Sequence, residues 1–176
     1  RLHHISGATT VYVTHDQVEA MTMSSNIAVM KEGIIQQMAT PDQVYHYPSN
    51  LFVADFIGNP KVNLMSGWVA EKNLVDVGNF NVPVNTCRKS GEVVVGIRPE
   101  DVEISLKEKD NAVEFLAYSV LPAGADTTII ARRGNTELTV KEMGVSKIQM
   151  DQKIWLKFDK DAINLFDKAT GELICE

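Results

Sequence analysis

His15 is the residue of this sequence whose position best suits a chemical role. It follows the apolar run ATTVYV, residues 8–13, and precedes the helix-starting stretch DQVEAM. Ligands of open α/β sheets bind at the carboxyl ends of the strands, and the N–H groups at helix starts favour anions. An imidazole placed there can donate a hydrogen bond to a phosphate oxygen. The residues alone support a phosphate-contacting role and a structural role for His15 equally.

The other histidines and the cysteines predict no metal site. His3 and His4 are adjacent, so on a helix their side chains point about 100° apart and do not converge on one ion. We expect both to be solvent-exposed, and we expect His46, which lies between two tyrosines, to be a packing residue. Cys87 and Cys175 are far apart in the chain and form no ligand pair. Reduced thiols in a cytosolic protein are the default expectation.

The sequence contains no motif that would complete an active site. No glycine is followed by lysine, which excludes the phosphate-binding loop G-x-x-x-x-G-K-[ST]. The sequence also lacks G-x-G-x-x-G, C-x-x-C, H-E-x-x-H and G-x-S-x-G. The formal net charge of −6 argues against nucleic acid as a partner, because nucleic-acid-binding proteins carry a basic face. No apolar run approaches the roughly 20 residues of a membrane helix.

Residues 1–58 read as the tail of an α/β domain without a closed core of its own. RLHHISG predicts the end of a helix with Gly7 as its cap, and this start inside a helix suggests a fragment. We then expect a strand over 8–13 that is buried on both faces of a parallel sheet, a helix in THDQVEAMTM, and a hairpin around Gly33. Two short helices should follow, in TPDQVYHY and SNLFVADFIG.

Side-chain spacing predicts how these helices begin and which faces they bury. In the first helix, Thr14 with Gln17 or Asp16 with Glu19 has the spacing of a capping box. The second helix should begin with a capping box of Thr40 and Gln43. The residues expected to face inward are Val18, Met21 and Thr22 in the first helix, and Phe52, Val53, Phe56 and Ile57 in the third.

From residue 59 onward, short β-rich runs recur about every ten residues, separated by Gly, Asn, Asp and Pro. Several alternate apolar and polar residues, as in KIWLKF, which is typical of strands with one buried face. We place a domain boundary near residues 58–62, with domains at 1–58 and 59–176. The predicted fold class is mostly β with a small α/β part, and the second domain is a small antiparallel barrel or sandwich.

Four motifs, in order, resemble one family: T-H-D-Q-x-E-A-M, F-I-G-x-P-x-x-N, G-I-R-P-E and L-F-D-x-x-T-G. The chain is similar along essentially its whole length to ATPase subunits of maltose-type carbohydrate importers, which are ABC transporters. The resemblance implies that residues 1–58 end a nucleotide-binding domain and that 59–176 form an oligomer-binding-like (OB-like) regulatory barrel. It implies a cytoplasmic protein held at the inner face of the membrane by permease subunits.

The family's switch histidine, which contacts the ATP γ-phosphate and senses the opposite subunit of a head-to-tail dimer, maps onto His15. Asp16, Gln17 and Glu19 are expected to cap and orient the helix. The phosphate loop, glutamine loop, signature sequence and water-polarising carboxylate precede residue 1 in the family. ATP and Mg²⁺ are therefore expected in the full-length protein, whereas this chain alone should neither bind ATP tightly nor hydrolyse it.

The resemblance also implies partners for the barrel: a second copy of the protein and a possible regulatory protein. Arg98 and Glu100 of G-I-R-P-E are the candidates for a domain or dimer contact. In the alternative interpretation, Gly96 and Pro99 shape a strand end while Arg98 pairs with a neighbouring carboxylate. The loop VLPAGADTT, residues 120–128, departs from the family pattern, which puts a family-wide partner surface there in doubt.

Two other functions concern the chain by itself. An OB-like barrel can bind a small oxyanion or an oligonucleotide, although the acidic charge and the lack of clustered basic residues oppose both. A purely structural dimerisation domain is the other alternative. The transported sugar is not encoded here, since selectivity lies in the permease and the extracytoplasmic binding protein.

Overall fold

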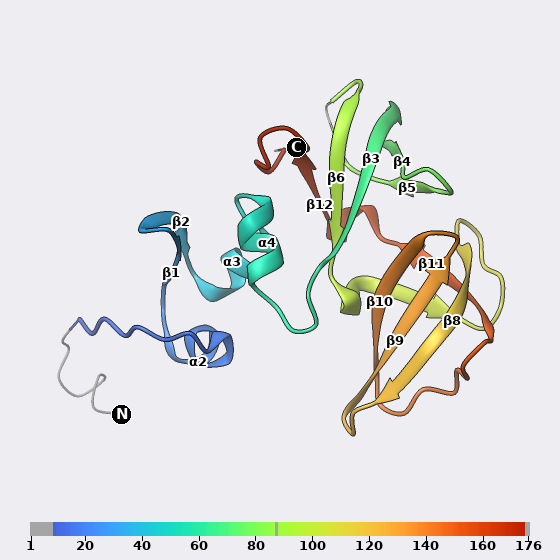
Figure 1. The fold of residues 1–176 in the computed structure, drawn as a ribbon, viewed down its shortest axis with the longest axis horizontal. Helices are drawn as coiled ribbons and strands as arrows, with labels where there is room; N and C mark the ends of the chain where they lie inside the picture. Colours follow the sequence, from blue (N-terminus) through green and yellow to red (C-terminus); the bar gives the residue numbers. More distant parts are fainter. Residues whose placement is uncertain (1–8, 87, 175–176) are drawn as a thin grey trace.

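A computed structural model describes residues 9–86 and 88–174 of the chain. The predicted helix end in RLHHISG, His3, His4 and both cysteines lie outside the described residues. The structure is mostly β and antiparallel, with the helices confined to the N-terminal part and two short 3₁₀ turns in the remainder (Figure 1). The predicted fold class is therefore confirmed.

The N-terminal part consists of three short helices and one hairpin. Its elements are α2 (Gln17–Met23), β1 (Ile27–Lys31), β2 (Ile34–Ala39), α3 (Pro41–His46) and α4 (Leu51–Phe56). The hairpin turns at Glu32 and Gly33, whose φ angles of 51° and 80° belong to the left-handed region that two-residue hairpins require. α3 begins with the predicted capping box of Thr40 and Gln43. The hairpin and both later helices are confirmed.

The strand predicted over residues 8–13 is wrong. Residues 9–13 belong to no strand, and Val11 and Val13 are 86% and 90% exposed. A strand needs a neighbour for its N–H and C=O groups, and the described residues supply no strand beside it. Apolar, β-branched composition alone therefore does not produce the expected buried strand here.

α2 begins at the predicted cap residue Asp16, but without the predicted capping box, and it buries less than predicted. Asp16 is its N-cap, and the Oδ1 atom accepts hydrogen bonds from the Val18 and Glu19 N–H groups at 2.8 and 3.1 Å. Val18 is 69% exposed and Thr22 is also exposed, whereas Met21 is partly buried. The inward face predicted for this helix is thus wrong at two of three positions, and α2 contributes no fully buried side chain.

α4 packs on two sides, which joins the N-terminal part to the β-sheets. Val53 and Ile57 enter a cluster with the hairpin and α3 (Ile27, Val29 and Val44). Ala54 faces the other way, into a cluster formed with Val62, Val94 and Phe166. Of the four residues predicted on one face, Phe56 is the exception, because it is 46% exposed.

The C-terminal part is built from two five-stranded antiparallel sheets. Their orders are β12-β6-β3-β4-β5 and β10-β9-β8-β11-β7. The strands are β3 (Asn63–Glu71), β4 (Leu74–Asp76), β5 (Asn81–Pro83), β6 (Gly91–Ile97), β7 (Val102–Ser105), β8 (Val113–Pro122), β9 (Asp126–Arg133), β10 (Thr136–Met143), β11 (Lys153–Phe158) and β12 (Ile163–Asp167). The 3₁₀ turns are η1 (Pro99–Asp101) and η2 (Lys160–Ala162). The predicted succession of short strands is confirmed, and β5 is a short strand that the prediction missed.

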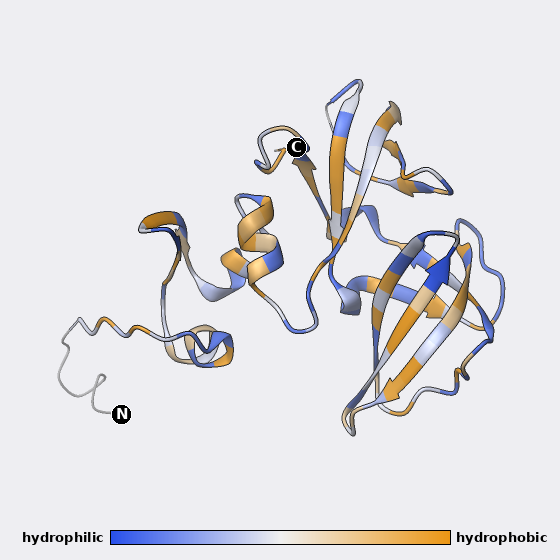
Figure 2. Ribbon diagram, viewed as in Figure 1, coloured by the Kyte–Doolittle hydropathy of each residue, from blue (hydrophilic) through white to orange (hydrophobic). Residues whose placement is uncertain are grey.

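β6 contains the run VVVGI, residues 93–97, in which apolar and polar residues do not alternate. Val93, Val95 and Ile97 point into the core shared by the two sheets. Val94 points to the opposite face, where it packs against Ala54 of α4. A strand segment covered on both faces is hydrophobic throughout, and Figure 2 shows the hydrophobic colour along the middle of β6, after its hydrophilic start.

Asn63 links the two sheets by a pair of hydrogen bonds. Its side chain, in a residue that is 7% exposed, donates to the Thr139 carbonyl at 2.8 Å and accepts from the Thr139 N–H at 2.7 Å. Asn63 lies on β3 and Thr139 on β10, so the contact joins strands of different sheets. A carboxamide can satisfy both groups of one peptide, which accounts for an asparagine at the end of F-I-G-x-P-x-x-N.

The turn after β12 depends on the ionised form of Asp167. The Oδ1 atom accepts hydrogen bonds from the Thr170 and Ala169 N–H groups, both at 2.9 Å, and the Oδ2 atom lies 2.7 Å from Arg88 Nη1. The Thr170 N–H and then the Arg88 guanidinium lower the pKa of this carboxyl to about 2. Protonation therefore weakens the turn.

We expect the free energy of unfolding of the wild-type protein to fall between pH 4 and pH 2 as Asp167 becomes protonated. The native pKa lies below the ordinary value of 3.8, so this contribution is complete above pH 4 and is lost as the pH falls toward 2. Asp167→Asn should flatten that part of the profile. Urea unfolding followed by circular dichroism at pH 2–5 measures it, and equal slopes for both proteins would contradict the assignment.

Candidate functional site

His15 lies on the exposed segment that enters α2, one residue before the helix cap. Hydrogen bonds on either side of it fix the backbone. Thr14 Oγ1 accepts from the Asp16 N–H at 3.0 Å and donates to the Glu19 carboxylate at 2.9 Å. Tyr12 also donates to Glu19, at 3.1 Å. The imidazole therefore stands on an ordered turn and is accessible to a ligand.

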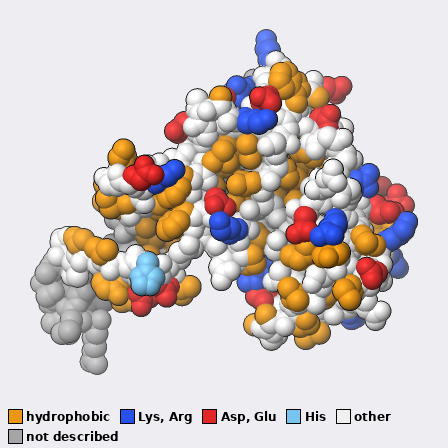
Figure 3. Space-filling view, viewed as in Figure 1, with side chains coloured by type: hydrophobic (Ala, Val, Ile, Leu, Met, Phe, Trp, Pro, Cys, Tyr) orange, Lys and Arg blue, Asp and Glu red, His pale blue; other side chains and the backbone are white. Residues whose placement is uncertain are grey.

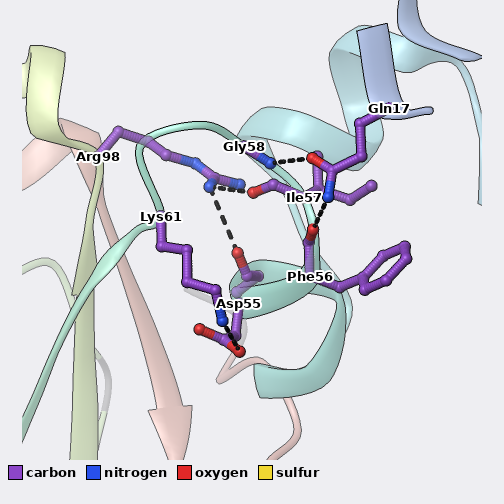
Figure 4. A network of polar contacts seen from close by, with 8 residues as sticks. Gln17, Asp55, Phe56, Ile57, Gly58, Lys61 and Arg98 are labelled. Carbon is purple, nitrogen blue, oxygen red and sulfur yellow. Dashed lines mark hydrogen bonds and ion pairs between the residues drawn. The ribbon is translucent and has the colours of Figure 1, made fainter. Parts of the chain in front are cut away.

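The predicted capping role holds for Asp16 and, through Thr14, for Glu19, but Gln17 does something the sequence did not indicate. Its Nε2 atom donates to the Phe56 carbonyl, and its Oε1 atom accepts from the Gly58 N–H at 2.9 Å. Figure 4 shows this carboxamide against the end of α4. Gln17 thus attaches the start of α2 to a segment about forty residues later. The one sequence signal for this contact is that Gln17 and the segment 56–58 both belong to motifs of the family, T-H-D-Q and F-I-G.

Arg98 is buried between the helices and the sheets, with 2% of its surface exposed. Its guanidinium donates to the Ala54 carbonyl at 3.3 Å, to the Ile57 carbonyl, and to the Tyr45 carbonyl at 3.0 Å. It also lies over the Tyr45 ring, 4.2 Å from the centroid. These carbonyls end α3 and α4, where a cation is favoured. The alternative interpretation, in which Arg98 pairs with a neighbouring carboxylate, is therefore wrong.

Glu100 lies beside this contact without touching Arg98 directly. Its exposed carboxylate accepts a hydrogen bond from the Tyr45 hydroxyl. Burial of the phenol, followed by this hydrogen bond, raises the pKa of Tyr45 to about 12. Arg98 and Glu100 thus both bind Tyr45, one at its carbonyl and ring and the other at its hydroxyl.

His46 is more exposed than predicted. His46 was expected to be a packing residue, but it is exposed at the end of α3, with its Nε2 atom 3.6 Å from Asp42 and its ring edge-on to Tyr45. Helix ends lie at the surface, and two aromatic neighbours in sequence do not change that. Across residues 9–86 and 88–174, no group of three His, Cys, Asp or Glu side chains could hold a metal ion.

Hydrophobic side chains are exposed over the N-terminal part (Figure 3). Met30, Ile34, Ile35 and Met38 of the hairpin are between 53% and 68% exposed. Large clusters of exposed apolar side chains mark surfaces that contact protein, membrane or ligand. None of the helices in the described part of the chain has the length and apolar character needed to cross a bilayer.

No family model matches the chain. Individual relatives do match it over 99% of its length. It is 36% identical to the trehalose/maltose import ATP-binding protein MalK of Thermococcus litoralis and 36% identical to the xylose/arabinose import ATP-binding protein XacK of Haloferax volcanii. It is 34% identical to the ABC transporter ATP-binding protein YcjV of Escherichia coli. The matches cover 50%, 48% and 51% of these proteins, so the chain spans about half their length.

A solved structure shows the fold of the β-rich part. The cytoplasmic molybdate-binding protein ModG superposes with a TM-score of 0.52, covering 58% of this chain and 94% of ModG, at 11% sequence identity. At this identity the likeness concerns the fold alone, and it confirms the expected OB-like barrel architecture. Nearly every residue of the chain is thus similar to one half of the ATP-binding proteins of ABC transporters, including two whose names state import of sugars.

Proposed function

We propose that this chain is part of the ATP-hydrolysing subunit of a carbohydrate importer, with His15 as the residue that contacts the terminal phosphate. The observation that carries the proposal is the match of 99% of the chain to sugar-import ATP-binding proteins. The exposed His15 on its ordered turn supports it, because a ligand can reach the imidazole. ATP and Mg²⁺ are the cofactors of the whole protein.

The chemistry asked of His15 is electrostatic. Negative charge shifts among the oxygens of a phosphoryl group as it is transferred, and a donor fixed beside them stabilises the transition state. The turn formed by Thr14, Asp16 and Glu19 fixes the backbone that carries the imidazole. His15 fits such a role because its imidazole is exposed and its backbone is held by the hydrogen bonds of Thr14.

We assign residues 1–58 to the nucleotide-binding domain and 59–176 to an OB-like regulatory domain. The separate apolar clusters around Val44 and within the two sheets support this division. The exposed apolar side chains of the hairpin support packing of the first part against further protein. The partners of the whole protein are a second copy, membrane permease subunits at the inner face of the membrane, and a regulatory protein on the barrel.

We expect the chain of residues 1–176 by itself to show neither tight ATP binding nor ATP turnover. One imidazole on an exposed turn cannot replace the backbone N–H cradle and lysine that hold nucleotide phosphates. Isothermal titration with Mg·ATP and a phosphate-release assay test this expectation. ATP turnover that copurifies with the chain and is unchanged in the His15→Ala variant would refute both this expectation and the assigned role of His15.

The experiment that tests the proposed function uses the full-length protein. Its ATP turnover should depend on His15, and the expected magnitude is argued in the Discussion. Transport of a sugar into vesicles that contain the cognate permease should depend on His15 to the same extent. A full-length protein that lacks ATPase activity under all such conditions would overturn the proposal.

A further inference from the structure

The last turn of α4 and the residues after it, 54–58, are held from two sides (Figure 4). From α2, Gln17 binds the Phe56 carbonyl and the Gly58 N–H. From the β-sheets, Arg98 binds the Ala54 and Ile57 carbonyls. The last carbonyls of a helix have no partner within the helix. Here those partners come from α2 on one side and from the end of β6 on the other.

The contacts made by Gln17 and by Arg98 lie against each other at Gly58. A side-chain carbon built on Gly58 would lie 2.7 Å from Arg98 Nη1, so the guanidinium packs directly against the residue whose N–H binds Gln17. Gly58 has a φ of 115°, a conformation that side chains rarely adopt. Residue 58 is therefore restricted to glycine both by its backbone and by Arg98.

Within the described part of the chain, α2 has few other attachments. It contributes no fully buried residue, and only Ala20 and Met21 pack partly against the hairpin cluster. The carboxamide of Gln17, with one hydrogen bond donated and one accepted, is thus a main link between α2 and the rest of the molecule. His15 lies two residues before Gln17, on the segment that enters α2.

We propose that Gln17 is a positioning residue, which couples the placement of His15 to the β-sheets through the α4 turn that Arg98 holds. The proposal rests on the proposed function for what His15 does, but the coupling itself is a property of this chain. Because linkage is reciprocal, a change at Arg98 should loosen α2, and a change at Gln17 should loosen the segment that Arg98 holds.

The chain contains a matched control for Gln17. The carboxamide of Gln37 makes the same pair of bonds at the end of α3, to the Tyr47 carbonyl at 3.0 Å and the Ser49 N–H at 2.9 Å. Gln37→Leu therefore removes identical chemistry at a different helix end. Lys61 gives a second control, because its exposed ammonium pairs at 2.8 Å with Asp55, which lies on α4.

Hydrogen–deuterium exchange of the intact protein tests the coupling. Gln17→Leu should speed amide exchange about thirtyfold in both α2 and residues 56–58, since two hydrogen bonds of about 1 kcal/mol each are lost and 1.4 kcal/mol corresponds to tenfold. Arg98→Lys should speed exchange at 54–58 and also in α2, which Arg98 does not touch. Gln37→Leu and Lys61→Met should leave α2 unchanged. If Arg98→Lys leaves the amide exchange rates of α2 unchanged, the coupling is overturned.

Kinetics of the full-length protein separate this proposal from the proposed function. Gln17→Leu should lower kcat for ATP about tenfold with little change in KM, because the nucleotide is held elsewhere and only His15 is misplaced. Gln37→Leu should leave both constants unchanged. If His15→Ala proves fully active while the exchange coupling holds, the role of His15 fails and the coupling stands. If His15→Ala is inactive but Gln17→Leu behaves as Gln37→Leu in both assays, the positioning role fails alone.

Discussion

Replacing His15 by alanine in the full-length protein is expected to lower ATP turnover by about 10²–10³-fold, which is the usual loss for one preorganised donor to a developing charge. The Asp16 cap and the Thr14–Glu19 hydrogen bond do not involve the imidazole, so the turn should survive the substitution. The binding of Mg·ATP should change little. A phosphate-release assay with the permease present measures the loss.

The chain provides a control for this substitution. His46 is also exposed, but it lies at the end of α3 and contacts Asp42 and Tyr45, whereas His15 precedes α2. His46→Ala should therefore leave turnover within about twofold, because exposed single substitutions rarely perturb a structure by more than about 0.5 kcal/mol. Full activity in His15→Ala, or an equal loss in both variants, would reject the assigned role.

Replacing Arg98 by methionine is expected to lower the free energy of unfolding by about 3 kcal/mol. Three main-chain carbonyls lose their donor, and hydrogen bonds to a charged group are worth about 1.5–3 kcal/mol each, offset by the desolvation of the guanidinium. Lysine should recover only part of this, since one ammonium cannot reach the ends of both α3 and α4 as the planar guanidinium does. Urea unfolding followed by circular dichroism gives the values.

Arg132 is the matching control for Arg98. It also lies over a tyrosine ring, 3.5 Å from the centroid of Tyr118, and it pairs with Glu137 at 2.6 Å, but both partners are exposed. Arg132→Met should cost less than about 1 kcal/mol, because exposed ion pairs contribute little. If Arg98→Met cost no more than Arg132→Met, the attachment of the helices to the sheets would not depend on Arg98.

Local signals in the sequence predicted most of the elements, because each signal acts over a few residues. Thr40 and Gln43 cap α3 within one turn, and Gly33 allows the hairpin to reverse. The alternation in KIWLKF matches a strand that buries Ile154, Leu156 and Phe158 on one face. β5 escaped prediction because its one buried residue, Val82, stands between an asparagine and a proline, which are both uncommon in strands.

Longer-range features could not be read in the same way. The run 8–13 has strand composition, but whether it becomes a strand depends on a neighbour that local composition does not specify. Val18 and Thr22 have helical spacing, yet spacing states only which residues share a face, not whether anything covers that face. Arg98 could be chosen as a candidate, but not its partners, which lie about forty to fifty residues away.

The sequence by itself determined that His15 precedes a capped helix, that the remainder is β-rich, and that the whole chain resembles sugar-import ATPases. Only the tertiary structure decided what Gln17, Asn63 and Arg98 bind, because each satisfies main-chain groups of a distant segment. Main-chain N–H and C=O groups are the same in every residue, so no residue type at the far end marks where such a bond will form. That is the physical reason why caps and strands were predictable here, while the link from His15 through α4 to the barrel was not.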